Sequence, residues 1–116
     1  MLEAMSPGAN PCERNDVVPA GGGGVSNPEL LPVSKLDVIY PSSARGARQE
    51  ARVILQAIIN EDGWVSDISV IDTDTDNIDF LTAAKQTVSF WRYKPAEHEG
   101  CPVAVYFTIV VSWRLG

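Results

Sequence analysis

The stretch FWRYKPAEHEGCPVAV, residues 90–105, can be interpreted in two ways. Its aromatic rings and cations could form a surface for nucleic acid, or they could mark a helix that ends and turns into a strand. The residue before a proline avoids the helical region of backbone space, so a helix arriving from upstream must end before Pro95. The chain carries a net charge of −6, which repels a polyanion. We therefore interpret residues 90–105 as a helix end, a turn and a strand start, and expect no nucleic-acid partner.

The segment upstream of residue 90 has the periodicity of an amphipathic helix. Apolar and small residues recur every three or four positions and predict one buried stripe, formed by Phe80, Ala83, Ala84, Thr87, Val88 and Trp91. Asp79 directly precedes the stripe, where a carboxylate would accept hydrogen bonds from the first unpaired amides of the helix. We predict a helix capped by Asp79, with Trp91 in the core.

The segment downstream, from Val103 to about Trp113, alternates as a half-buried strand does. Its odd-numbered positions are all apolar and should face the core: Val103, Val105, Phe107, Ile109, Val111 and Trp113. Its even-numbered positions are mixed and should face outward: Ala104, Tyr106, Thr108, Val110, Ser112 and Arg114.

The middle of the chain predicts a hairpin. Residues 52–60 form an apolar strand, NEDG (60–63) supplies the turn, and residues 64–73 form the second strand, with a bulge near Ser66–Asp67 where the apolar phase changes. A helix starts within YPSSARGARQEA (40–51), because Pro41 suits a first helical turn. The predicted order is helix, strand, strand, helix, strand. This order indicates an α+β fold: a three-stranded antiparallel sheet with two helices packed on one face.

The first 27 residues are rich in proline and contain the run Gly21–Gly24, a composition typical of flexible linkers. We predict a flexible tail over residues 1–27 and one domain over residues 28–116, in which 28–39 form an extended lead-in or edge segment. The N-terminus lacks the basic and apolar regions of a signal peptide, and no apolar run approaches the ~20 residues that span a bilayer. We therefore expect the membrane anchor to be absent from this chain.

The chain offers little for catalysis or metal binding. His98 could act as a base for Cys101, or join Cys12 and Cys101 around zinc, but three such ligands fall short of a closed site. We expect His98 to be a solvated turn residue. The acidic stretch DTDTDNID (72–79) lacks the glycine and glutamate that an EF-hand loop requires at fixed positions. We predict a protein that is not an enzyme and has no metal and no cofactor.

Cys12 and Cys101 are the only cysteines in the sequence. A disulfide between them would close a loop of about 90 residues, worth roughly 4–5 kcal/mol by chain entropy, and would suit an oxidising compartment. The alternative is two unrelated thiols, because pairing cannot be deduced from sequence.

Four motifs, taken in order, resemble the C-terminal domain of the TonB energy-transducer family. They are YPSSAR (40–45), VILQAIINEDGWVSDISV (53–70), AAKQTVSFWRYKPA (83–96) and GCPVAVYFTIVVSWRL (100–115). The family pattern has Tyr-Pro-x-x-Ala, a strand, Asp-Gly-x-Val, a second strand, a helix ending in Trp-Arg-Phe/Tyr-x-Pro, and Gly-x-Pro-Val before the last strand. The chain departs from it in the acidic turn DTDTDN and at Cys101, which stands at a usually polar position.

The resemblance implies a periplasmic protein-binding domain of a longer protein anchored in the inner membrane. Such domains couple inner-membrane energy to outer-membrane transporters and capture a short transporter peptide, the TonB box, beside their last strand by strand addition. The residues that we expect to contact this partner are Val103, Ala104, Tyr106, Thr108 and Val110.

Two alternatives stay open from the sequence. The domain could be an accessory or sensory part of another protein, such as a membrane-bound protease or kinase. The open sheet edge could instead pair with a second copy, which would give a self-associating, strand-exchanged periplasmic homodimer.

Overall fold

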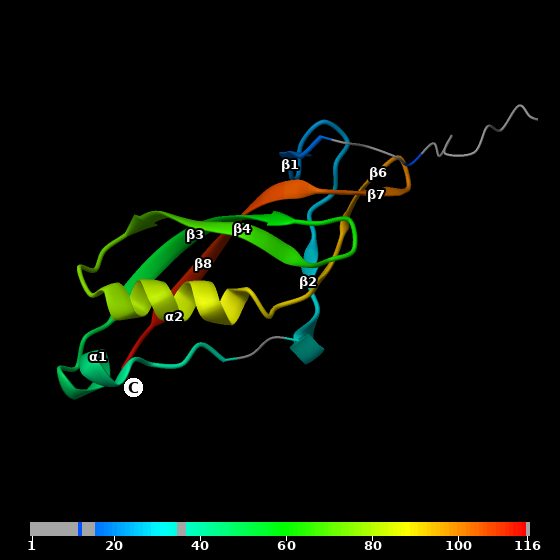
Figure 1. Cartoon of the computed structure of the whole chain (residues 1–116). Helices are drawn as coiled ribbons and strands as arrows, with labels where there is room; N and C mark the ends of the chain where they lie inside the picture. The colour runs from blue at the N-terminus through cyan, green and yellow to red at the C-terminus, as the bar shows by residue number, and fades with distance from the viewer. Residues whose placement is uncertain (1–11, 13–15, 35–36, 116) are drawn as a thin grey trace, which may run out of the picture.

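The computed structural model describes Cys12, residues 16–34 and residues 37–115 (Figure 1). In chain order the elements are β1 (Val18–Pro19), β2 (Glu29–Leu30), the 3-10 turn η1 (Pro32–Ser34), α1 (Ser42–Gly46), β3 (Ala51–Ile59), β4 (Val65–Thr73), α2 (Ile78–Val88), β5 (Tyr93–Lys94), β6 (Ala96–His98), β7 (Cys101–Val103) and β8 (Val105–Trp113). The α-helices and the long strands follow the predicted order, and the α+β class is confirmed.

The main sheet has the strand order β1-β8-β3-β4. The central strand β3 pairs antiparallel with β8 through an unbroken register from Ala51↔Trp113 to Ile59↔Val105. On its other side β3 pairs antiparallel with β4, with two register shifts. The three long strands are therefore the predicted antiparallel sheet, and the short parallel strand β1 is an addition to it.

Helix α2 lies across one face of this sheet (Figure 1). The predicted stripe is confirmed up to the helix end, since Phe80, Ala84 and Val88 are fully buried. The helix ends at Val88, earlier than predicted, and Trp91 packs in the same core from the turn that follows it. The predicted cap is wrong: the N-cap is Asn77, whose side chain accepts a hydrogen bond from the Asp79 amide at 3.0 Å. The helix begins earlier than its apolar stripe, at Ile78, which places Asp79 in the first turn. There Asp79 accepts a 2.6 Å hydrogen bond from Ser43 of α1.

The other predicted helix is a single turn, α1, on the same side of the core as α2. Its Ala44 is fully buried. Arg48 has a φ of 56°, a left-handed conformation that ends the helical path soon after Gly46. A helix this short is not stable by itself, so α1 depends on packing against α2.

The β3–β4 hairpin confirms one predicted bulge and adds another. Asp67 has a φ of 50° and lies where the register shifts between Gln56 and Ile58. A second shift, between Ile54 and Leu55, was not predicted. The turn of the hairpin docks on β5, because the amide of Tyr93 donates to the carbonyl of Gly63 at 2.9 Å.

The predicted final strand from Val103 to Trp113 is interrupted. β7 pairs with β6 in a separate small hairpin, and β8 begins after Ala104. Glu99 and Gly100, at the tip of this hairpin, both have positive φ values, 52° and 81°, as a tight two-residue turn requires. The chain therefore leaves one sheet and enters the other at Ala104.

Residues 16–27, which the sequence assigns to a flexible tail, contact the domain in the structure. β1 pairs with β8, Val25 forms a bridge with His98, and the Ser26 amide donates to the Glu97 carbonyl at 2.9 Å. Residues 1–11 and 13–15 of the predicted tail lie outside the described residues. The predicted edge segment 28–39 contains β2, which pairs with β5.

Within the described ranges, no helix is long and apolar enough to cross a membrane.

Candidate functional site

The backbone groups of β8 face two different sides in alternation. The Asp74 amide donates to the Arg52 carbonyl at 3.3 Å, so the even-numbered residues of β3 direct their backbone groups toward β4. The odd-numbered residues of β3 and β8 therefore bond to each other. On the far side of β8, Val18 and Ala20 donate to the carbonyls of Ala104 and Tyr106, both at 3.2 Å. The even-numbered residues of β8 thus present their N–H and C=O groups to the outer edge.

Among the residues that the structure describes, β1 covers only one end of this outer edge. β1 is in register only with Val105 and Tyr106. In the part of the chain that the structure describes, no strand pairs with the outer edge of β8 beyond Tyr106. The backbone groups of Thr108, Val110 and Ser112 are therefore available there to an added strand.

The side chains of the same residues lie on the face of the sheet away from α2. Tyr106 and Val110 are 44% and 49% exposed, and Thr108 and Ser112 are also exposed. β8 carries no charged residue from Val105 to Trp113. An added strand would therefore meet an uncharged, partly apolar surface.

A groove of about 400 Å³ follows the second half of β8. It is lined by Asp37, Val38, Tyr40, Trp91, Val110, Val111, Ser112, Trp113 and Arg114. The indole N–H of Trp113 donates to the Ile39 carbonyl at 3.3 Å, which holds the segment before α1 next to the end of β8. The groove thus lies beside the open part of the β8 edge.

The structure divides the predicted partner-binding residues into three groups. Val103 is fully buried and pairs with Ala96, so it belongs to the small hairpin. The carbonyls of Ala104 and Tyr106 already accept hydrogen bonds from the segment that contains β1. Thr108 and Val110 lie on the open part of the edge.

Ser112 also belongs to this edge and was not among the predicted contacts, although the alternation of β8 places it with Thr108 and Val110. We define the open segment of the β8 edge as Thr108–Ser112.

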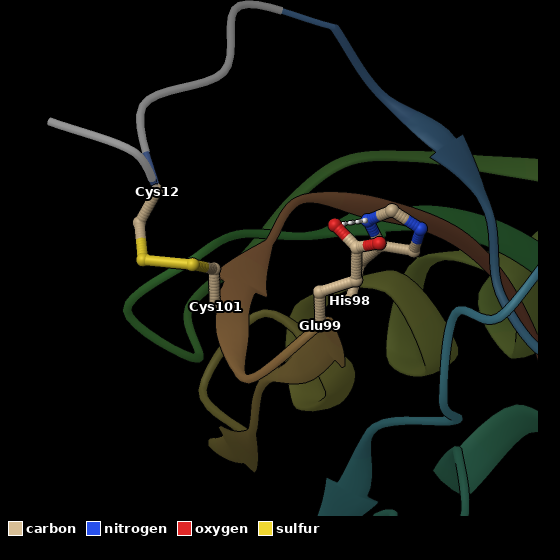
Figure 2. The surroundings of a disulfide bond; sticks show 4 residues. All are labelled: Cys12, His98, Glu99 and Cys101. Atoms are coloured by element: carbon tan, nitrogen blue, oxygen red, sulfur yellow. Dashed lines mark ion pairs between the residues drawn. A yellow bond between two sulfur atoms is a disulfide. The ribbon is translucent and has the colours of Figure 1, made fainter.

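Cys12 and Cys101 form a disulfide that joins the N-terminal segment to β7 (Figure 2). A disulfide sulfur is neither a thiolate nucleophile nor a thiolate ligand, so Cys101 in this state supports neither the base–nucleophile pair nor the zinc site considered above. His98 lies 4.0 Å from the Glu99 carboxylate, measured from Nδ1 to Oε2. Among the described residues, no cluster of three or more His, Cys, Asp and Glu side chains could hold a metal ion.

Burial raises the pKa of Tyr93 to about 12, because the phenolate would lose its hydration. Tyr93 is 5% exposed, and its ring contacts that of Phe107 edge-on at 5.8 Å between centroids. This tyrosine is therefore a neutral core residue that links β5 to β8.

The family model described as the C-terminal domain of the Gram-negative bacterial TonB protein matches residues 37–115. The chain is also 28% identical over 112 residues to the protein TonB of Pseudomonas aeruginosa, a match that covers 95% of this chain and 32% of that protein. The chain therefore spans about a third of the length of this curated relative.

Solved structures show the same fold. The solution structure of the Pseudomonas aeruginosa TonB C-terminal domain superposes with a TM-score of 0.63 at 23% identity, covering 82% of this chain and 90% of that one. The TonB2 protein from Vibrio anguillarum superposes with a TM-score of 0.58 at 26% identity, covering 90% of this chain and 98% of that one.

Proposed function

Because the chain belongs to the family of Gram-negative TonB C-terminal domains, we propose that it captures the TonB box of an outer-membrane transporter as an added strand on β8. The observation that carries this proposal is the open segment of the β8 edge, where Thr108, Val110 and Ser112 direct their backbone groups outward. An extended peptide gains affinity from main-chain hydrogen bonds at such an edge, each worth about 0.5–1.5 kcal/mol net.

Specificity would come from the side chains of the added strand, which alternate between the two faces of the sheet. One set would lie beside Thr108 and Val110 on the exposed face. The other set would point toward the side of α2, where the groove offers Tyr40, Trp91 and Trp113. Because β8 itself is uncharged, shape and apolar contact would select the guest more than charge does.

The role in the cell follows from the same family membership. We propose a non-catalytic, periplasmic domain that contributes to energy transduction for transport, as one part of a longer protein anchored in the inner membrane. The Cys12–Cys101 disulfide supports the location, because disulfides persist in oxidising compartments such as the bacterial periplasm.

A titration of the isotope-labelled chain with synthetic TonB-box peptides, followed by NMR, tests the proposal. Amide signals of Thr108, Val110 and Ser112 should shift with peptide concentration, while those of β4 serve as the internal control and stay in place. If none of the peptides shifts these amide signals, the proposal of strand addition on β8 is wrong. The same shifts on concentrating the chain without peptide would instead indicate a second copy on this edge.

A further inference from the structure

The outer edge of β8 already holds one strand of the chain itself. β1 lies parallel to β8 at Val105 and Tyr106. We propose that β1 is a capping strand, clamped by the Cys12–Cys101 disulfide, that confines a guest strand to the open segment Thr108–Ser112. The capping role needs no partner and can be tested on the chain by itself, whereas the confinement of a guest rests on the proposed function.

The capping strand is anchored on both sides to the same hairpin, β6–β7. Before β1, Cys12 is bonded to Cys101 (Figure 2). After β1, Ser26 and Glu97 exchange two hydrogen bonds of 2.9 Å, from the Ser26 amide to the Glu97 carbonyl and from the Glu97 amide to the Ser26 hydroxyl. A short segment tethered at both ends has a high effective concentration at its docking site. Its two bonds to Ala104 and Tyr106 are therefore maintained although β1 is short.

Apolar contact adds to these bonds. The side chains of Val18, Ala20 and Val25 are partly buried and pack against the hydrophobic core. The glycines at 21, 23 and 24 have positive φ values, which let the chain turn back between β1 and Val25 without strain. The glycine run thus serves as a turn that returns the chain to the hairpin.

Pro19 makes the capping strand a poor template for further pairing. Val18 and Ala20 direct their amides toward β8, so the nitrogen of Pro19 faces the opposite side by alternation. A proline nitrogen carries no hydrogen, and prolines on edge strands prevent pairing with another strand. Pairing over β1 is therefore blocked, and a guest on β8 must end before Tyr106, which pairs with the last residue of β1.

Amide hydrogen exchange tests the capping strand without any ligand. In the native chain, the Val18 and Ala20 amides should exchange slowly, because they donate to the carbonyls of Ala104 and Tyr106. In the double variant Cys12→Ser with Cys101→Ser they should exchange at least tenfold faster, while the Ile109 amide, which faces β3, keeps its rate. Unprotected Val18 and Ala20 amides in the native chain, or an unchanged rate in the double variant, would overturn the clamp.

A second pair of variants tests the capping strand if the disulfide variant does not fold. Val18→Pro removes the donor to Ala104, whereas Val17→Pro removes an amide that faces away from β8 by alternation. The Ala20 amide should lose protection in Val18→Pro and retain it in Val17→Pro. Equal protection in both variants would show that β1 is not held through these bonds.

The confinement of the guest is tested with two TonB-box peptides, one of about five residues, matching 108–112, and one about four residues longer. The short peptide should bind native chain and Val18→Pro equally, and the long peptide should bind Val18→Pro at least fivefold more tightly. Equal affinity of the long peptide for both would contradict confinement. If neither peptide binds any variant, the proposed function fails, and the exchange rates of Val18 and Ala20 still decide whether β1 caps the edge.

Discussion

The two edges of the main sheet are built differently. β8 pairs with β3 through nine consecutive residue pairs without a shift, and it carries no charge. β4, at the opposite edge, pairs with the same strand through two register shifts and carries Asp67 and Asp72. Both strands have the same length, nine residues, so the contrast lies in regularity and charge.

The contrast explains why one edge is suited to a guest and the other is protected. A guest strand needs outward N–H and C=O groups at regular spacing, and each bulge breaks that spacing and bends the strand. Bulges and charged residues are the features by which natural sheets avoid pairing at an edge. β4 has both, whereas β8 has neither, and within the described ranges β1 covers it at Val105 and Tyr106.

The largest change in stability is expected from substitution of Gly63, in the turn between β3 and β4. A Cβ added there would lie 2.0 Å from the Tyr93 carbonyl oxygen, and φ is 87°. Gly63→Ala should lower the free energy of unfolding by roughly 2–4 kcal/mol, from overpacking and left-handed strain. Chemical denaturation measures this change. Gly46→Ala is the matched control: its Cβ would meet nothing within 4 Å, and stability should be unchanged or slightly higher.

Val110→Pro tests the edge of β8 directly. The amide of Val110 faces outward, so a proline there removes a donor for the guest and keeps the bonds between β3 and β8. Binding of a TonB-box peptide, measured by calorimetry, should weaken at least tenfold, or about 1.4 kcal/mol. Val110→Thr keeps the amide and the branched shape and should bind like the native chain. Equal weakening in both variants would indicate that the side chain, not the backbone, carries the contact.

A smaller effect is expected at Asp67, in the bulge of β4. Glycine accepts the positive φ of this position without cost, so Asp67→Gly should raise the free energy of unfolding by roughly 0.5–1 kcal/mol. Asp72→Gly removes the same charge from a residue paired with Ile54 whose φ is not positive, and it should lower stability because glycine weakens a strand. If both variants are destabilised alike, the left-handed bulge is not a fixed feature of β4.

The last predicted effect appears only at alkaline pH and concerns Tyr93, which bonds to the β3–β4 turn and packs against Phe107 of β8. Its pKa is raised from 10.0 to about 12, so the unfolded state loses this proton first as pH rises. Tyr93 therefore contributes stability that is complete below pH 10 and falls progressively between about pH 10 and 12. Denaturation of the native chain and of Tyr93→Phe across this interval should show a steeper decline in the native chain. If the stability of both proteins falls equally with pH, the phenol of Tyr93 is not buried.

The sequence predicted the elements whose periodicity is strong, and it missed those held by distant contacts. The α2 stripe and the alternation of β8 could be predicted because each element buries one face against the same core. β1 was missed because Val18 and Pro19 have no periodic pattern, and they form a strand by pairing with the distant strand β8. The composition of 16–27 suggested a linker, yet its glycines form the turn and its proline blocks an edge.

The candidate site was predictable in outline and not in extent. Alternation identified Tyr106, Thr108 and Val110 as the outward set, but nothing in the sequence indicates which neighbours cover a strand edge. The break at Ala104, which assigns Val103 to another hairpin, arises from the turn at Glu99 and Gly100 and from pairing with β6. The groove beside β8 depends on the segment 37–40, which has no regular structure of its own.

The most direct test of strand addition at β8 uses a TonB-box peptide that carries a nitroxide spin label at one end. Bound beside β8, the label should broaden the amide signals at the nearer end of Thr108–Ser112 most strongly, and those of Asp67 and Asp72, two strands further away, clearly less. Moving the label to the other end of the peptide should move the broadening along β8. Broadening centred on β4, or spread equally over both edges, would contradict the proposal that the guest adds to β8.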